Sequence, residues 1–122
     1  MPGGWAGFLW VCLGGAVGSG ARYVATLGAM RLFGVALWGT FAVNLLGSFL
    51  LGVIVPLALR GSLSEQMRLA LGVGVMGGFT TYSTFNLEVL TLAQQGTSAH
   101  AALYAFATLV GCLAAGICGL WL

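Results

Sequence analysis

Four long apolar segments, separated by short polar links, make up almost the whole chain. They cover roughly residues 5–29, 36–59, 67–95 and 99–122. A membrane-spanning helix needs about 20 predominantly apolar residues, so each segment is long enough to cross a bilayer. The pattern therefore predicts an all-α membrane protein in which residues 1–122 form a single four-span domain.

Composition agrees with this prediction. Hydrophobic residues make up 60% of the 122 residues and charged residues only 5%, whereas a soluble domain carries about 25% charged residues. Because the links are short, we expect no domain outside the lipid bilayer, and the function must lie within the cell membrane. The first segment is unlike a secretory signal, because it is long, lacks a basic start and has Arg22 near its far end.

The third segment contains a polar group in its middle. Gly77 and Gly78 are followed closely by four hydroxyl side chains, those of Thr80, Thr81, Ser83 and Thr84. Hydrocarbon offers no water to an opened backbone, so such a break must line a protein-enclosed cavity or an ion site. We expect the third helix to be broken near its middle, at the glycine pair.

Glycine is frequent, with 21 residues, although in a helix interior it costs about 1 kcal/mol relative to alanine. In lipid, small residues let helix backbones approach closely and so promote helix association. The pairs Gly14 and Gly18, and Gly74 and Gly78, have the four-residue spacing typical of such contacts. We expect most glycines to serve helix packing.

The basic residues are balanced between the two sides of the predicted membrane domain. Arg60 and Arg68 fall near one side, and Arg22 and Arg31 near the other. The excess of Lys and Arg that normally fixes orientation is therefore close to zero. A chain without an orientation preference inserts both ways, and two copies then pair head to tail. This predicts a dual-topology, antiparallel homodimer.

The sequence lacks the residue patterns of an enzyme or a side-chain metal centre. Cys12, Cys112 and Cys118 form no C-x-x-C motif, and His100 has no evident partner. No nucleotide-binding loop or catalytic triad is present, and the net charge of +2 does not indicate nucleic-acid binding. We predict that the chain is not an enzyme and binds neither nucleotide nor nucleic acid.

Three blocks of the sequence resemble the bacterial fluoride channels called Fluc or CrcB. They are Gly-Ser-Gly-Ala-Arg-Tyr at 18–23, Trp-Gly-Thr-Phe-Ala-Val-Asn-Leu-Leu-Gly-Ser-Phe at 38–49 and Gly-Gly-Phe-Thr-Thr-Tyr-Ser-Thr-Phe at 77–85. The resemblance covers essentially the full chain. It implies a passive, fluoride-selective channel that exports fluoride across the bacterial inner membrane and relieves fluoride toxicity. It also implies two pores in each antiparallel homodimer.

The resemblance further implies a structural sodium ion at the centre of the dimer. Its ligands carry over to the main-chain carbonyls of Gly77 and Thr80 from each subunit. Sodium is a hard cation that prefers oxygen ligands, and an unwound helix segment frees carbonyls to bind it. The alternative is a glycine kink without an ion.

For the fluoride pore, the resemblance points to Phe85 and Tyr82, where Tyr82 replaces the phenylalanine usual in the family. Aromatic rings have electropositive edges, which coordinate an anion weakly. Ordinary core packing is the alternative for both rings. Asn44 corresponds to a pore-entrance residue that donates to fluoride, or else it forms an interhelical hydrogen bond.

Further pore residues are expected among the hydroxyls. Thr81, Ser83 and Thr84 either face the anion path or bond back to their own helix. Along the fourth segment a family-like polar track falls on one helix face, at Tyr104, Thr108 and Cys112.

Two charged residues lie near this region. The resemblance places Arg22 at a vestibule that attracts the anion, and the alternative is a side chain that snorkels to the lipid headgroups. Glu88 either holds Asn44 or Arg22 in place or lies at an interface.

Two other functions are weighed against the channel. A small multidrug exporter also has four spans and dual topology, but it needs a carboxylate deep in a span for proton exchange. The first span has none, and Glu88 is far from that placement. A non-transporting scaffold would have no reason to bury hydroxyls beside a helix break.

Overall fold

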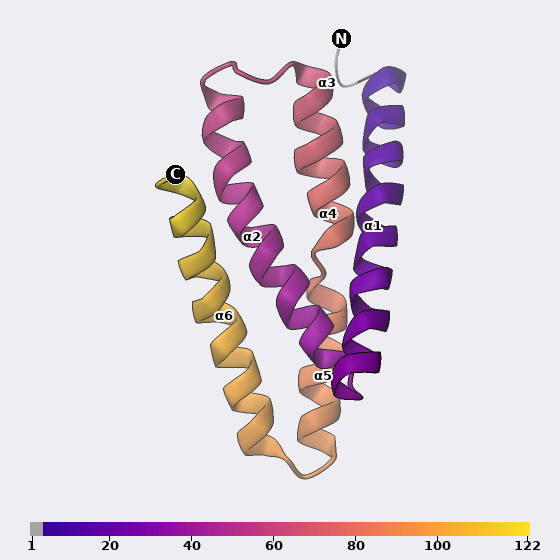
Figure 1. The fold of residues 1–122 in the computed structure, drawn as a ribbon, viewed down its shortest axis with the longest axis vertical. Coiled ribbons are helices and arrows are strands. Elements are labelled where there is room, and N and C mark those ends of the chain that lie inside the picture. Colours follow the sequence, from indigo (N-terminus) through magenta and orange to yellow (C-terminus); the bar gives the residue numbers. More distant parts are fainter. Residues whose placement is uncertain (1–3) are drawn as a thin grey trace.

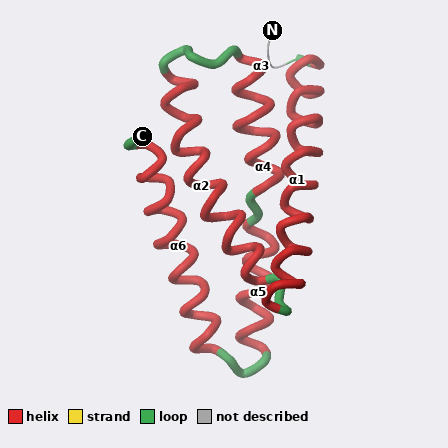
Figure 2. The backbone as a smooth tube through the Cα atoms, viewed as in Figure 1, coloured by secondary structure: helices red, strands yellow, loops and turns green. Residues whose placement is uncertain are grey.

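The computed structural model describes residues 4–122 as a bundle of helices joined by short loops (Figures 1 and 2). In chain order the elements are α1 (Trp5–Phe33), α2 (Leu37–Leu59), α3 (Glu65–Met67), the π-helical η1 (Arg68–Val75), α4 (Met76–Phe79), α5 (Tyr82–Gln94) and α6 (Ser98–Leu120). Every regular element within the described residues is helical, as the sequence predicts.

Three helices in residues 4–122 are long and apolar enough to cross a membrane: α1 with 29 residues, and α2 and α6 with 23 residues each. They match the first, second and fourth predicted segments, although α1 runs four residues beyond its predicted end at 29. It ends at Gly34, whose φ of 77° lies in the left-handed region that glycine adopts without strain. The third predicted segment is divided among α3, η1, α4 and α5.

Small residues set how closely these helices pack. α1 packs against η1 and α4, while α2 packs against α6 (Figure 1). A Cβ atom at Gly14 would overlap the carbonyl oxygen of Ala70, and one at Gly18 would overlap that of Val75. The predicted packing role of this glycine pair is therefore confirmed, and it operates between α1 and the η1–α4 region of the same chain.

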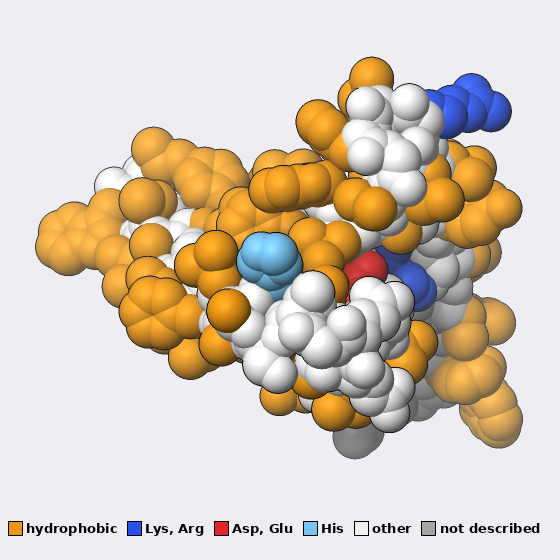
Figure 3. Space-filling model, turned by 90° about the horizontal axis from the view of Figure 1, so that it is seen from below, with side chains coloured by type: hydrophobic (Ala, Val, Ile, Leu, Met, Phe, Trp, Pro, Cys, Tyr) orange, Lys and Arg blue, Asp and Glu red, His pale blue; other side chains and the backbone are white. Residues whose placement is uncertain are grey.

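The surface carries many large apolar side chains and few charged ones. Trp5, Leu59 and Trp121 are among those more than four-fifths exposed, at 82%, 83% and 84%. The end view in Figure 3 shows hydrophobic side chains over much of the surface and few charged side chains. Apolar patches of this extent are typical of surfaces that face lipid or another protein.

Candidate functional site

The chain is extended for two residues between α4 and α5. Thr80 has φ −83° and ψ 153°, and Thr81 has φ −149° and ψ 121°. The sequence placed this opening at Gly77 and Gly78, but both glycines are helical within α4. The difference arises because Thr81 caps α5: its hydroxyl accepts a hydrogen bond from the Thr84 N–H at 3.2 Å.

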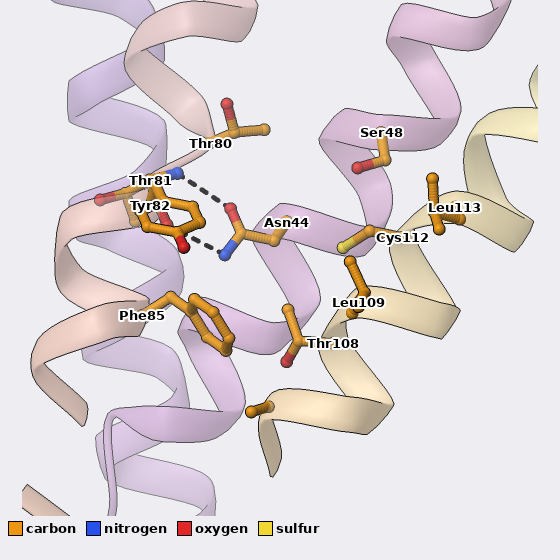
Figure 4. A pocket seen from close by; sticks show the side chains of 11 residues that line it. Asn44, Ser48, Thr80, Thr81, Tyr82, Phe85, Thr108, Leu109, Cys112 and Leu113 are labelled. Atoms are coloured by element: carbon orange, nitrogen blue, oxygen red, sulfur yellow. Dashed lines mark hydrogen bonds between the residues drawn. The ribbon is translucent and has the colours of Figure 1, made fainter. Parts of the chain in front are cut away.

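Asn44 of α2 satisfies the main chain at this opening. Its Nδ2 donates to the Thr81 carbonyl at 3.1 Å, and its Oδ1 accepts from the Thr81 N–H at 2.9 Å (Figure 4). These are the polar groups that a continuous helix would pair internally. The interhelical hydrogen bond predicted as one alternative is confirmed. One N–H of the Asn44 carboxamide is not used by either bond.

A cavity of about 550 Å³ opens beside this pair, between α2, the start of α5 and α6 (Figure 4). Its lining is formed by Asn44, Ser48, Thr80, Thr81, Tyr82, Phe85, Ala105, Thr108, Leu109, Cys112 and Leu113. No charged side chain is among them. We call this space the α2–α6 cavity.

Most of the predicted pore residues meet in the α2–α6 cavity, but five predicted site residues do not line it: Arg22, Gly77, Ser83, Thr84 and Tyr104. Ser48 was missed as a site residue. It follows Asn44 by four residues and so shares its helix face, which is the signal that identifies it.

Three aromatic rings form an edge-to-face series, of which Tyr82 and Phe85 line the cavity and Tyr104 lies behind Phe85. The centroids of Tyr82 and Phe85 lie 5.8 Å apart with an interplanar angle of 69°. Phe85 and Tyr104 are 5.3 Å apart at 63°. In this tilted arrangement the electropositive edge of one ring points toward the electronegative face of the next. Tyr82 is 78% exposed, so it lies at the open side of the site.

The hydroxyls beside the opening bond mainly among themselves. Thr81 Oγ1 donates to Thr84 Oγ1 at 3.2 Å and lies 3.4 Å from Ser83 Oγ. These side chains thus form local hydrogen bonds, and Thr81 also lines the cavity, so a role for them in the anion path stays a prediction. Thr108 differs, because its hydroxyl is buried and has no hydrogen-bond partner within residues 4–122.

Glu88 joins three helices. Its Oε2 accepts from the Thr40 hydroxyl of α2 at 3.1 Å, and its Oε1 accepts from the Tyr104 hydroxyl of α6 at 2.9 Å. Of the alternatives for Glu88, a bond to Asn44 or Arg22 is not formed, because hydroxyls from the two neighbouring helices reach it instead. That Glu88 lies at an interface stays a prediction. Thr40 was not predicted as a site residue, although it lies one turn before Asn44 on the same face of α2.

Arg22 binds the end of α4. Its Nε donates to the Gly78 carbonyl at 2.9 Å, and the side chain is half-buried. A cation is favourable there because carbonyls at a helix C-terminus carry partial negative charge. No hydrogen bond from residues 4–122 reaches the nearby carbonyls of Gly77 or Thr80. Gly77 is exposed, with open space where a side chain would be.

Comparison of the amino-acid sequence with those of known proteins identifies the family of this chain. The family described as CrcB-like protein, Camphor Resistance (CrcB), matches residues 9–120. The fluoride-specific ion channel FluC of Anaeromyxobacter dehalogenans is 54% identical over 112 residues, which cover 90% of this chain and 89% of the relative. The protein of the same name from Chelativorans is 46% identical over 114 residues, covering 92% and 91%.

The name of these relatives denotes an ion channel and not an enzyme, in agreement with the prediction from the sequence. The matches, together with three long apolar helices, identify a multi-pass protein of the bacterial membrane. The chain belongs to the CrcB family.

Proposed function

We propose that this protein is a passive, fluoride-selective channel that exports fluoride down its electrochemical gradient and protects the cell from this anion. The observation that carries the proposal is the α2–α6 cavity, where ring edges, an amide N–H and an unpaired hydroxyl converge. Relatives at up to 54% identity are named fluoride-specific ion channels, which supports the same function.

The cavity offers neutral donors for an anion that has left part of its hydration shell. The Thr108 hydroxyl is free to donate, and Asn44 keeps one amide N–H. Phe85 adds a weakly electropositive ring edge. Because no charged side chain lines the cavity, the anion is held weakly enough to leave again, as conduction requires.

Tyr104 supports this path indirectly. Its hydroxyl donates to Glu88 and its ring packs edge-on against Phe85. The carboxylate of Glu88 accepts hydrogen bonds from this hydroxyl and from that of Thr40, and it does not line the cavity that the anion would occupy. Tyr104 thus orients Phe85, whereas Thr108 and Cys112 provide the polar track along α6.

The functional unit in this proposal is an antiparallel homodimer with two pores. One chain leaves the cavity open and exposes apolar residues along its helices, and a second copy covers both. The balanced arginines permit insertion in either direction. A cysteine placed at Ser62 in a cysteine-free background tests the dual topology: in intact cells an impermeant thiol reagent labels about half of the chains if they insert both ways, and all or none if they insert one way.

A structural sodium ion fits the opening between α4 and α5. The carbonyls of Gly77 and Thr80 are not used by hydrogen bonds within residues 4–122, and such oxygens suit a hard cation. The exposed, unobstructed position of Gly77 lets a second copy approach and contribute its own carbonyls. When bound, the ion supplies positive charge that stabilises the opened backbone. Coordination distances in a crystal grown with sodium test this assignment.

Fluoride efflux from liposomes tests the function as a whole. A fluoride electrode is expected to record passive release from vesicles that contain the purified protein, while chloride is retained. Proton-coupled uptake of a cationic drug would indicate an exporter instead. Vesicles that stay sealed to both would indicate a scaffold.

A further inference from the structure

Cys112 lies where two cavities meet. It lines the α2–α6 cavity and also a second cavity of about 430 Å³ farther along the same helices, and the two share Ser48, Cys112 and Leu113. In Figure 4 its sulfur lies on the side of α6 that faces α2 and Asn44. The thiol therefore borders the space between α2 and α6 where the two cavities share their lining.

An independent feature is a buried polar group beside this space that has no protein partner. Thr108 precedes Cys112 by one helical turn, is 6% exposed and lines the same cavity, yet its hydroxyl has no partner within residues 4–122. A buried hydroxyl without a protein partner calls for water or another polar occupant. The neighbourhood of Cys112 thus contains an unsatisfied hydrogen-bonding group that favours the entry of water.

The other two cysteines provide an internal contrast. Cys12 and Cys118 are exposed on the outside of α1 and α6, and neither lines either cavity. The thiolate is the nucleophile in thiol chemistry, and an apolar environment disfavours it. Facing lipid, these two thiols are expected to react slowly with water-soluble reagents, whereas Cys112 meets such reagents inside the cavity.

We propose that Cys112 is a reversible covalent modification site for small disulfides and thiosulfonates, and that a mixed disulfide there closes the anion path. This inference rests on the proposed channel function. The Cys112 thiol loses its proton to water, and the thiolate attacks a sulfur of the reagent. A new S–S bond forms, the reagent's own S–S bond breaks, and its other half leaves as a thiolate or sulfinate with the electron pair.

Methyl methanethiosulfonate provides a test with the full-length protein in liposomes. The double variant Cys12→Ala, Cys118→Ala keeps only Cys112, and Cys112→Ser keeps only the other two. Mass spectrometry counts the methylthio groups, and a fluoride electrode compares each variant with its own untreated rate. We expect the double variant to gain one group per chain, to lose most of its flux and to recover it with dithiothreitol. Cys112→Ser should keep its own rate.

Two results would overturn the inference. One is the absence of a mass gain at Cys112, and the other is a modified channel whose flux is unchanged. Failure of the channel function itself is separate, because it appears as absent fluoride release before any reagent is added. The mass measurement still reports access to Cys112 in that case.

Discussion

Asn44 and Thr81 form a reciprocal pair in which one carboxamide binds both the N–H and the carbonyl of one extended residue, at 2.9 and 3.1 Å. The pair lies 37 residues apart in sequence and joins α2 to the chain between α4 and α5. Since lipid supplies no substitute hydrogen bonds, the opened backbone depends on this side chain. Asn44 thus belongs to the framework of the site as well as to its lining.

Replacement of Asn44 by leucine should destabilise the protein strongly. The substitution keeps side-chain size but leaves two buried main-chain groups unpaired, at about 1–3 kcal/mol each. We expect the unfolding free energy, measured by SDS titration in detergent, to fall by about 2–6 kcal/mol. Ser48→Ala is the matched control, because Ser48 lines the same cavity without a side-chain hydrogen bond in residues 4–122. Equal losses for both variants would contradict the bridging role.

Gly47 and Thr80 fix the distance between α2 and the opening. A Cβ atom at Gly47 would overlap the Thr80 Cγ2 methyl, while its other neighbours, Cδ2 of Phe79 and Cβ of Thr80, remain at 3.5 and 3.6 Å. Gly47→Ala should therefore strain the site and cost about 1–3 kcal/mol, as overpacking of a tight contact does. Thermal unfolding of the purified protein measures the loss.

The Thr80→Ser variant provides the test of that contact. Serine removes the methyl but keeps the hydroxyl, which donates to the Met76 carbonyl at 2.9 Å. In a double-mutant cycle, Thr80→Ser should restore most of the stability that Gly47→Ala loses. Additive losses would show that the two residues do not interact in this way.

Phe85 should determine conduction more than stability. Phe85→Ile replaces the ring between Tyr82 and Tyr104 by an aliphatic side chain without an electropositive edge. We expect fluoride efflux to be abolished or severely slowed while the dimer remains folded. Phe106→Ile is the control, because this ring is 65% exposed and lies outside the cavity. Unchanged flux in Phe85→Ile would rule out the role of the ring edge.

The helices could be predicted from sequence because bilayer thickness fixes the length of an apolar segment. The exact opening could not be predicted in the same way. Glycine marks where a helix is weak. The break instead includes Thr81, just before α5, because Asn44, far away in sequence, satisfies the Thr81 backbone. The hydroxyl of Thr81 then caps the new helix. A local pattern contains no information on this tertiary partner.

In the candidate site, too, local features could be predicted from the sequence, whereas tertiary partners could not. Phe85, Thr108 and Cys112 could be placed together from their motif and helical spacing, and they line one cavity. The partners of Glu88 lie 48 residues before it and 16 residues after it. Choosing among candidate partners for a single carboxylate requires the packing of three helices, so the sequence left the role of Glu88 undecided.

Arg22 should contribute to both stability and anion supply, and two substitutions separate these effects. Arg22→Met removes the hydrogen bond to the Gly78 carbonyl, and a bond of this charged type is worth about 1.5–3 kcal/mol. Arg31→Gln is the stability control, because Arg31 is exposed and its side chain makes no hydrogen bond in residues 4–122. An equal loss of unfolding free energy in both variants would contradict a specific role for the Gly78 bond.

Arg22→Gln keeps a donor for Gly78 but removes the positive charge. If this charge attracts fluoride to the vestibule, flux should fall at low ionic strength and approach that of the intact protein as salt is raised. The reason is that the Debye length shortens from about 30 Å at 0.01 M to about 10 Å at 0.1 M, which screens the attraction of this half-buried charge for anions in the surrounding water. A deficit that is independent of salt would instead place the effect in the geometry of α4, because a main-chain contact is not screened by ions in solution.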